Sequence, residues 1–594
     1  MERPSTRTIT ALYVLALSLL LVILLHLFGA DIFDGAWMAR HWSSVSSAYL
    51  IGWALVAAAL VLLCLRYPGF LDRLASTPPA IISAAVLVLL LTILLGYNHF
   101  VYGTGNLRVA QIAQADPIVH RWYEYGASLL VSLLYKIVAV SDLKDTTAGA
   151  LAWRIYAYTA TALSIWASIR LAGALTDNGF KRVFVFATLF AGPHLLSMLG
   201  LIAVEPGLVA VFLWQAVLLY QLSQNHSTTR LALLWVVTLL GVWLHWTGIV
   251  LIPPALLLSL SPGERLRLPA VIIALLAFVA IITAVYLRVG SDFEFSQFVL
   301  MLEGHNPRAD YALFSGRHIT DLLQLLAITF PAVLLLKLFW WRQLPTRRSR
   351  FRWAITAQAI GALAVLIMLN PENGMPLDLP LLLVYLTPMA VLLATFISDL
   401  DFTTGPARAV IVVGGLSNLI MIGSVLPVYA DIHNADQYLK PYLQRHNALF
   451  MSGAFAFRDA YFERGELDQA NAWEWEVPLQ SLAYMHLEGA SRLVDNQEYS
   501  EGLKSLYQIK VEHPYWAEPR ALIATTLMSL GRPQQARPEI DTCLMLQPYR
   551  QEFHINRYTA LRQQRKHDSA LMYIQRALEL WPDETSIRVD HMYG

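Results

Sequence analysis

Residues 203–222 read AVEPGLVAVFLWQAVLLYQL, and this stretch decides the class of fold. Glu205 is its only formally charged side chain. An α-helix of about 20 predominantly apolar residues spans the hydrocarbon core of a bilayer. Pro206 directly follows the glutamate, and proline is favoured in the first turn of a helix. The stretch therefore predicts a membrane-spanning helix that begins near Glu205.

The rest of the chain has the same apolar character. Of 594 residues, 56% are hydrophobic and only 14% are charged, whereas soluble domains carry about 25% charged residues. Segment 127–140 is short for a span, and we expect an interfacial or re-entrant helix there. Thirteen segments are predicted to span the membrane: about 9–29, 48–65, 80–97, 150–172, 182–197, 203–222, 231–245, 246–260, 268–288, 321–340, 352–369, 380–398 and 407–427.

Lysine and arginine in short loops indicate which side of the membrane is cytoplasmic. The strongest marker is WRQLPTRRSRFR at 341–352, and Arg3 and Arg7 place the N-terminus on the same side. The first apolar run lacks a small-x-small cleavage site, so we predict that it is retained as a helix. The opposite, non-cytoplasmic face then carries 30–47, 98–149, 289–320, 370–379 and the C-terminal tail. We expect a bacterial inner membrane with a periplasmic tail, or the ER lumen in a eukaryote.

Charge and cysteine content exclude some classes of function. The net charge is +1, so no global field indicates nucleic-acid binding. The two cysteines, Cys64 and Cys543, lie far apart in the sequence and support neither a disulfide framework nor a zinc site.

The charged tail after about residue 430 contains a repeat. Pro514, Pro548 and Pro582 are spaced by 34 residues, and Ala536 and Ala570 each precede a proline by 12. This period and the small residues are typical of tetratricopeptide repeats, in which we expect the prolines to end each second helix. Unit 483–516 is degenerate, and a helical pair at about 448–482 is predicted to join the membrane part to the stack. The alternative is an unrelated helical bundle.

The predicted fold is thus all-α, a polytopic membrane bundle followed by a helical solenoid. We predict three regions: two N-terminal spans at 1–79, a membrane domain at 80–430 and a non-cytoplasmic repeat domain at 431–594. The groove of such a repeat stack commonly binds a peptide or a partner protein.

Ionisable side chains concentrate at the predicted non-cytoplasmic ends of the spans, where hydrocarbon would otherwise exclude them. Asp31 and Asp34 are three residues apart, so they could share one helix face and one divalent cation. The alternative is a hydrated loop at a helix end.

The first long outer loop contains YGTGNLRVAQIAQADPIVHRWYE at 102–124. Asp116 precedes Pro117, which favours a turn or a helix N-cap. Arg108 and Arg121 have the guanidinium geometry that suits a phosphate. The alternative is an amphipathic interfacial helix whose charged side chains reach water.

Other outer segments add candidates of the same kinds. Arg154 lies inside an apolar run and is expected to be paired. His245 alone is more often a satisfied core histidine than a catalyst. The remaining candidates are Glu205, His305, Arg308, Arg317, His318, Asp321 and Asp378.

The layout from the third span to about residue 427 resembles the GT-C superfamily of glycosyltransferases, which use polyprenyl-phosphate-linked sugars. The appended repeats look like the transmembrane-plus-tetratricopeptide O-mannosyltransferase group and similar bacterial proteins. In such bacterial relatives the last outer loop often reads N-P-x-x-G-x-P-R-D, and here Leu377 replaces the arginine while Asp378 fits. FSGRHITDLLQ, which includes His318 and Asp321, looks like a second shared stretch.

The resemblance implies an acidic residue in the first outer loop, which acts as a base or helps to bind a metal. Thr104, Gly105 and Asn106 stand at that place. A hydroxyl or an amide can hydrogen-bond but cannot abstract a proton near neutral pH. Asp116 is the nearest replacement, and Asp31 or Asp34 could also reach the site.

Two hypotheses follow. In the first, the protein transfers a sugar from a polyprenyl-phosphate donor to a protein, glycan or lipid acceptor. Asp116 would be the base, Arg108, Arg121 and Arg308 would hold the phosphate, and His318 or His305 would assist the leaving group. In the second, an inactive scaffold or lipid-binding subunit recruits protein partners through its repeats. A transporter is disfavoured because no inverted repeat is evident.

Overall fold

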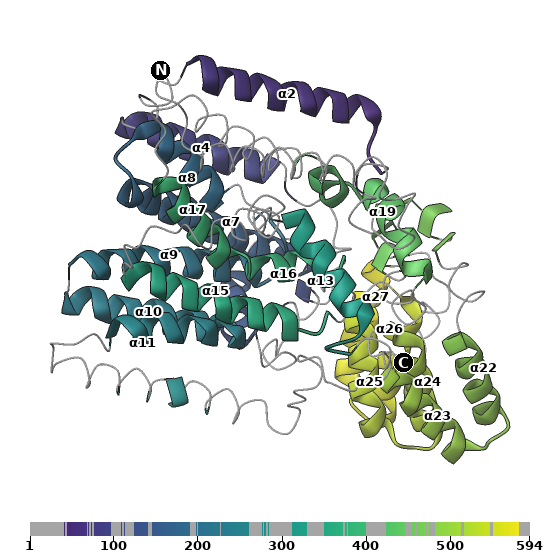
Figure 1. Cartoon of the computed structure of the whole chain (residues 1–594). Coiled ribbons are helices and arrows are strands. Elements are labelled where there is room, and N and C mark those ends of the chain that lie inside the picture. Colours follow the sequence, from purple (N-terminus) through teal and green to yellow (C-terminus); the bar gives the residue numbers. More distant parts are fainter. Residues whose placement is uncertain are drawn as a thin grey trace. The chain divides into compact units, whose positions relative to one another are not determined.

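The computed structural model describes a large part of the chain, and all residues not named here lie outside the description. The described ranges are 44–67, 77–94, 124–139, 145–190, 200–225, 227–259, 312–329, 350–371, 378–399, 425–445, 482–512, 516–546 and 550–580, with isolated positions between them. The elements in these ranges are helices, as expected for an all-α protein (Figure 1). The chain divides into two compact units, the first within residues 1–442 and the second mainly 443–594.

The first unit is a bundle of apolar helices. Its central helix is α9 (Glu205–Gln224), which packs against α7 (Asp145–Leu175), α10 (Thr228–Leu244) and α15 (Arg350–Met368). Most of α9 is buried, in keeping with the apolar composition of 203–222. The remaining helices of the unit are α2 (Ser47–Arg66), α4 (Pro78–Leu94), α6 (Tyr125–Val138), α8 (Gly179–Phe190), η4 (Trp246–Leu251), α11 (Ile252–Ser259), α13 (Gly316–Thr329), α16 (Leu379–Val384), α17 (Thr387–Asp399) and α19 (Ile432–Arg445), the last of which runs across the boundary between the units.

Three of the described helices are long and apolar enough to cross a membrane, by length and composition: Glu205–Gln224, Arg350–Met368 and Leu381–Asp399. They correspond to the predicted spans 203–222, 352–369 and 380–398. The other spans stay predictions. Segment 246–260 is not one continuous α-helix, because it begins with the 3₁₀ helix η4 before α11.

The helices of the bundle alternate in direction, and contacts between them distinguish its two ends. At one end, Lys181 Nζ donates to the Ser398 carbonyl at 3.2 Å, and Arg352 pairs with Asp399. The beginnings of α8 and α15 therefore meet the end of α17. At the other end, the Tyr156 hydroxyl of α7 donates to the Val204 carbonyl just before α9, at 3.1 Å. We call these the basic end and the polar end.

A sharp reversal at the polar end joins α10 to η4. The Gly248 N–H donates to the His245 carbonyl at 2.9 Å. An added Cβ at Gly248 would lie 2.3 Å from the Gly241 carbonyl, which is rigid backbone. Only glycine permits this approach, so the two elements pack against each other from the first turn of η4.

The second unit contains a structural repeat. Its second helices are α23 (Tyr499–Glu512), α25 (Pro533–Leu546) and α27 (His567–Leu580), which begin at intervals of 34 residues. Each ends two residues before Pro514, Pro548 or Pro582, as expected for helices stopped by proline. The first helices of the pairs are α22 (Leu482–Asp495), α24 (Ala517–Ser529) and α26 (Gln551–Gln563).

The turns inside the pairs repeat as well. The Glu498, Arg532 and Lys566 N–H groups each donate to a carbonyl five residues earlier, at 2.8–3.0 Å. The residue before each donor has a positive φ, 66° at Gln497, 70° at Gly531 and 59° at Arg565. This is a Schellman-type helix end. The earlier pair shows the same signature, because Glu466 donates to the Tyr461 carbonyl at 3.0 Å and Gly465 has φ 75°.

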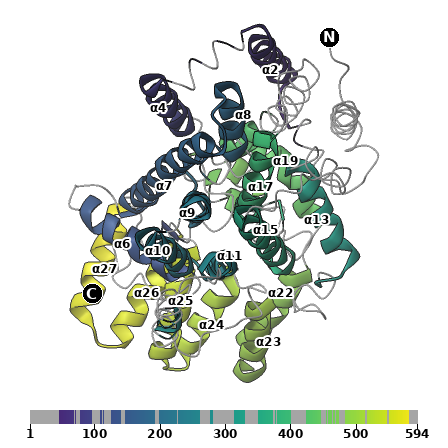
Figure 2. The ribbon, with the colours of Figure 1, turned by 60° about the vertical axis from the view of Figure 1, so that its left-hand side comes forward.

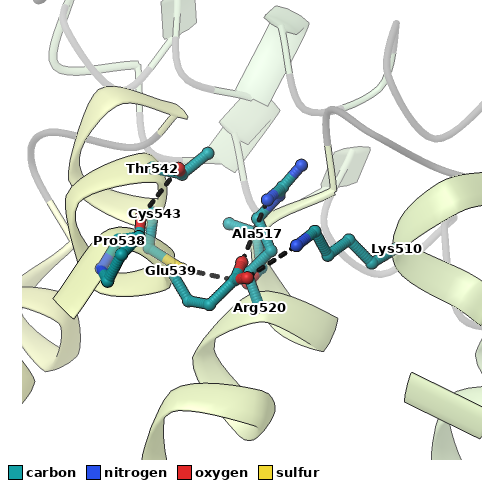
Figure 3. Close-up of polar contacts among 7 residues, drawn as sticks. All are labelled: Lys510, Ala517, Arg520, Pro538, Glu539, Thr542 and Cys543. Atoms are coloured by element: carbon teal, nitrogen blue, oxygen red, sulfur yellow. Dashed lines mark hydrogen bonds and ion pairs between the residues drawn. The ribbon is translucent and has the colours of Figure 1, made fainter. Parts of the chain in front are cut away.

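Helix pairs in this unit are held by small residues and by ion pairs. Ala536 and Ala570 are 0% and 2% exposed, so the predicted close approach of helices occurs at both. The Glu539 carboxylate accepts from Lys510 of α23 at 2.6 Å and from Arg520 of α24 at 3.0 Å (Figure 3). One carboxylate of α25 thereby links three helices. The assignment of these pairs to the tetratricopeptide family stays a prediction.

Candidate functional site

Buried polar side chains from several elements gather at the polar end of the first unit. Glu124 precedes α6, Glu205 begins α9, His245 lies between α10 and η4, Thr247 is in η4, and Tyr385 follows α16. Each is 0–3% exposed. Burying polar groups among apolar helices is unfavourable unless they are hydrogen-bonded. Their collection at one end therefore marks this region as the candidate functional site.

His245, Thr247 and Tyr385 form a continuous hydrogen-bond chain. His245 Nδ1 lies 2.7 Å from Thr247 Oγ1, which lies 2.8 Å from the Tyr385 hydroxyl oxygen. The Thr247 backbone N–H also donates to His245 Nδ1, at 3.3 Å. Because Tyr385 is 138 residues from Thr247 in sequence, the chain ties η4 to the junction of α16 and α17.

Two carboxylates act on the tyrosine end of this chain. Glu205 and Glu124 both lie within electrostatic range of the Tyr385 hydroxyl. α16 packs against α9, which brings Tyr385 to the helix start that holds Glu205. A helix N-terminus carries partial positive charge and favours an acidic side chain there. The site thus combines acids, a phenol, a hydroxyl and an imidazole.

A second buried polar group lies deeper in the same bundle. Gln215 of α9 donates to Thr238 Oγ1 of α10 at 2.8 Å and to the Leu251 carbonyl of η4 at 2.7 Å. Gln358 of α15 donates to Gln215 Oε1 at 2.7 Å. Side-chain hydrogen bonds between apolar helices hold them in one register. This group supports the site by tying together the helices that carry Glu205 and His245.

His318 is a separate predicted candidate, at the first turn of α13. Its side chain is 0% exposed, and Nδ1–H donates to the Leu313 carbonyl at 2.8 Å. Burial lowers the pKa of His318, while the hydrogen bond to Leu313 and the nearby Asp321 carboxylate act in the opposite direction. Nε2 is therefore the acceptor nitrogen of the neutral ring. Asp321 is 5% exposed, and Arg317 is partly buried.

The structure brings only some of the predicted site residues together. Glu205 and His245 lie at the polar end, as described above. Asp378 is 6% exposed, immediately before α16. Arg108 is 7% exposed and groups with the second unit. The candidates outside the described residues are Asp31, Asp34, Asn106, Asp116, Arg121, His305 and Arg308.

The sequence missed Thr247 and Tyr385. Both lie in apolar stretches, HWTGIVL and LLVYLT, where a hydroxyl is unremarkable. The proximity of Thr247 to His245 was the only available signal, since a histidine followed two residues later by threonine can close a local hydrogen bond. For metals, no group of three or more His, Cys, Asp or Glu side chains is placed to hold an ion within the described ranges.

No family model matches the chain, and no curated protein matches it. Among solved structures, the chain is similar to ArnT from Cupriavidus metallidurans bound to undecaprenyl phosphate. That match has a TM-score of 0.33 and 13% identity, and it covers 77% of this chain and 79% of the other. The apo state of the same protein gives a TM-score of 0.32 at 13% identity, with 77% and 78% covered. The class that composition and structure define is an all-helical protein with apolar helices of membrane-spanning length.

Proposed function

We propose that the protein is a membrane glycosyltransferase that uses a sugar linked to a polyprenyl phosphate. The observation that carries the proposal is the buried group of Glu124, Glu205, His245, Thr247 and Tyr385 at the polar end. Ionisable groups inside a membrane bundle are energetically costly, and they most often serve a function. The basic end carries Lys181, Arg182, Arg230 and Arg352, so the positive-inside rule assigns the polar end to the non-cytoplasmic face.

The reaction needs a base and a group that stabilises the leaving phosphate. The acceptor hydroxyl attacks the anomeric carbon, the bond from that carbon to the phosphate oxygen breaks, and the hydroxyl proton passes to a carboxylate. The products are the glycosylated acceptor and the free polyprenyl phosphate. Asp116 of the first outer loop and Glu205 of the polar end are the proposed base candidates. Arg108, Arg121 and Arg308 are the proposed phosphate ligands, because guanidinium groups suit phosphate oxygens.

A transfer assay in nanodiscs tests the proposal. The purified protein is given polyprenyl-phosphate-linked sugars with membrane extracts as the acceptor source, and sugar transfer is measured. If Asp116 is the base, Asp116→Asn lowers the rate roughly a hundredfold or more, because that is the usual contribution of a general base. The same result for Glu205→Gln would assign the role to Glu205. Glu488→Gln is the matched control, since Glu488 forms an exposed ion pair with Arg492.

Three outcomes would change the proposal. No transfer by the wild-type chain with any lipid-linked donor overturns the enzyme class. Wild-type rates in both acid variants remove Asp116 and Glu205 as bases. A stoichiometric complex with a partner protein in mild detergent, without bound lipid phosphate, would support the scaffold alternative. That alternative is favoured by the residues Thr104, Gly105 and Asn106 at the expected acidic position of the first outer loop.

A further inference from the structure

The two ring nitrogens of His245 have different partners, and this determines which of them carries the proton. Thr247 N–H donates to Nδ1 at 3.3 Å, and a backbone N–H can only be a donor. A proton on Nδ1 would face that N–H, so Nδ1 must be the acceptor. In the neutral imidazole the remaining nitrogen, Nε2, then carries the proton.

The same reasoning gives a direction to the hydroxyl chain. With Nδ1 as an acceptor, the Thr247 hydroxyl at 2.7 Å donates its single proton to it. That proton is then unavailable to Tyr385, so the Tyr385 hydroxyl donates to Thr247 Oγ1 across 2.8 Å. The order is Tyr385 to Thr247 to His245. Donors arranged head to tail in a low-dielectric interior strengthen one another.

We propose that Tyr385 and Thr247 are positioning residues that hold His245 as a neutral Nε2–H donor for an oxygen of the bound phosphate. The inference rests on the proposed function. Negative charge grows on the phosphate as the bond to the sugar breaks, and a pre-oriented donor stabilises that charge. No proton needs to leave the ring, which suits a side chain that is 2% exposed. Glu124 and Glu205 act on the far end of the chain, at Tyr385.

A purely structural role is the competing explanation, because His245 also caps η4 through Nδ1. Two substitutions separate the roles. In His245→Asn, Oδ1 takes the place of Nδ1 and keeps the cap, but the Nε2 donor is lost. In His245→Gln, the amide nitrogen takes the place of Nε2, but the cap is lost. Asparagine is itself a favoured capping residue, so this variant should fold.

The expected result is a wild-type melting temperature for His245→Asn with roughly a hundredfold lower kcat, the usual loss for one such donor. His245→Gln should retain more activity and melt at a lower temperature. Thr247→Ser should restore the rate that Thr247→Val and Tyr385→Phe lose. Full activity in His245→Asn would overturn the proposal and leave His245 as a helix cap.

Nitrogen NMR tests the tautomer without any enzymatic activity. Protein labelled with ¹⁵N-histidine in nanodiscs should show His245, assigned by its loss in His245→Asn, with a proton on Nε2 and none on Nδ1. The resonance should shift on addition of undecaprenyl phosphate, and a shift with inorganic phosphate alone would indicate a free anion as the ligand. A proton on Nδ1 would overturn the inference. If the tautomer is confirmed but no donor supports transfer, the proposed function fails and the hydrogen-bond chain stands.

Discussion

At the scale of single residues, close packing at the polar end leaves little freedom. Glycines occupy the places where two backbones meet, and polar side chains occupy the places where a hydrogen bond reaches a neighbouring element. Gly207 lies against the Tyr156 hydroxyl, which itself bonds the Val204 carbonyl at 3.1 Å. Small residues of this kind let helices approach closely in membrane bundles. The position of Glu205 therefore depends on its small neighbour as well as on its own helix.

Gly248→Ala should destabilise the first unit. The added methyl group would lie 2.3 Å from the Gly241 carbonyl, and neither backbone can move without separating α10 from η4. We expect a loss of about 2 kcal/mol or more, measured as a lower melting temperature in detergent. Gly173→Ala in α7 is the control, because nothing lies within 4 Å of its added Cβ. Equal melting temperatures for the two variants would contradict the close approach.

Cys543 should be inert towards thiol reagents in the folded protein. It is 1% exposed, and Sγ–H donates to the Ala517 carbonyl at 3.3 Å. Burial raises the pKa of this thiol, so the reactive thiolate stays scarce at neutral and mildly alkaline pH. Maleimide labelling of a Cys64→Ser variant between pH 7 and 9 should be slow and become fast in denaturant. Rapid labelling without denaturant would contradict the burial of Cys543.

At the scale of elements, the repeat unit is defined by its turns as much as by its helices. Four turns share a residue with positive φ followed by a long-range backbone bond, at Gly465, Gln497, Gly531 and Arg565. Glycine adopts this conformation at little cost, whereas other residues lose about 1 kcal/mol or more. The earlier helical pair at 448–482 is thus related to the stack by structure, although its sequence lacks the 34-residue spacing.

Exchanging residues at equivalent turns should shift stability in opposite directions. Gly531→Gln should lower the free energy of unfolding by about 1 kcal/mol, because φ is 70° there. Arg565→Gly should raise it by about 0.5–1 kcal/mol, since its φ of 59° is already unfavourable for a side chain. The expressed second unit, if it folds alone, or the whole chain can be followed by circular dichroism during urea unfolding. Changes of the same sign would show that these turns are not equivalent.

At the scale of the whole molecule, the basic end defines how the bundle should lie in a membrane. Lys181, Arg182 and Arg352 all lie where the helices begin or end opposite Glu205 and His245. Charged residues retained in the cytoplasm orient the helices during insertion. The polar end and the repeat domain are then expected on the same, non-cytoplasmic side.

Reporter fusions test this orientation. Alkaline phosphatase is active only outside the cytoplasm, so a fusion after Gly594 should be active and a fusion after Arg347 should be inactive. A green fluorescent protein that folds only in the cytoplasm should give the reverse pattern. Activity of the phosphatase at both positions would contradict the predicted number of spans, because one more or one fewer crossing moves the repeat domain to the other side.

Composition and periodicity alone determined that the protein is helical, that 203–222 forms an apolar helix, and that the helices of the tail end in step with prolines 34 residues apart. These properties are local, because apolar length, proline and small residues act within one or two helices. Only the tertiary structure joined Tyr385 to Thr247 and His245, and placed Glu124 and Glu205 beside the tyrosine. Such contacts depend on helix packing across more than a hundred residues of chain, and no short pattern in the sequence encodes that packing.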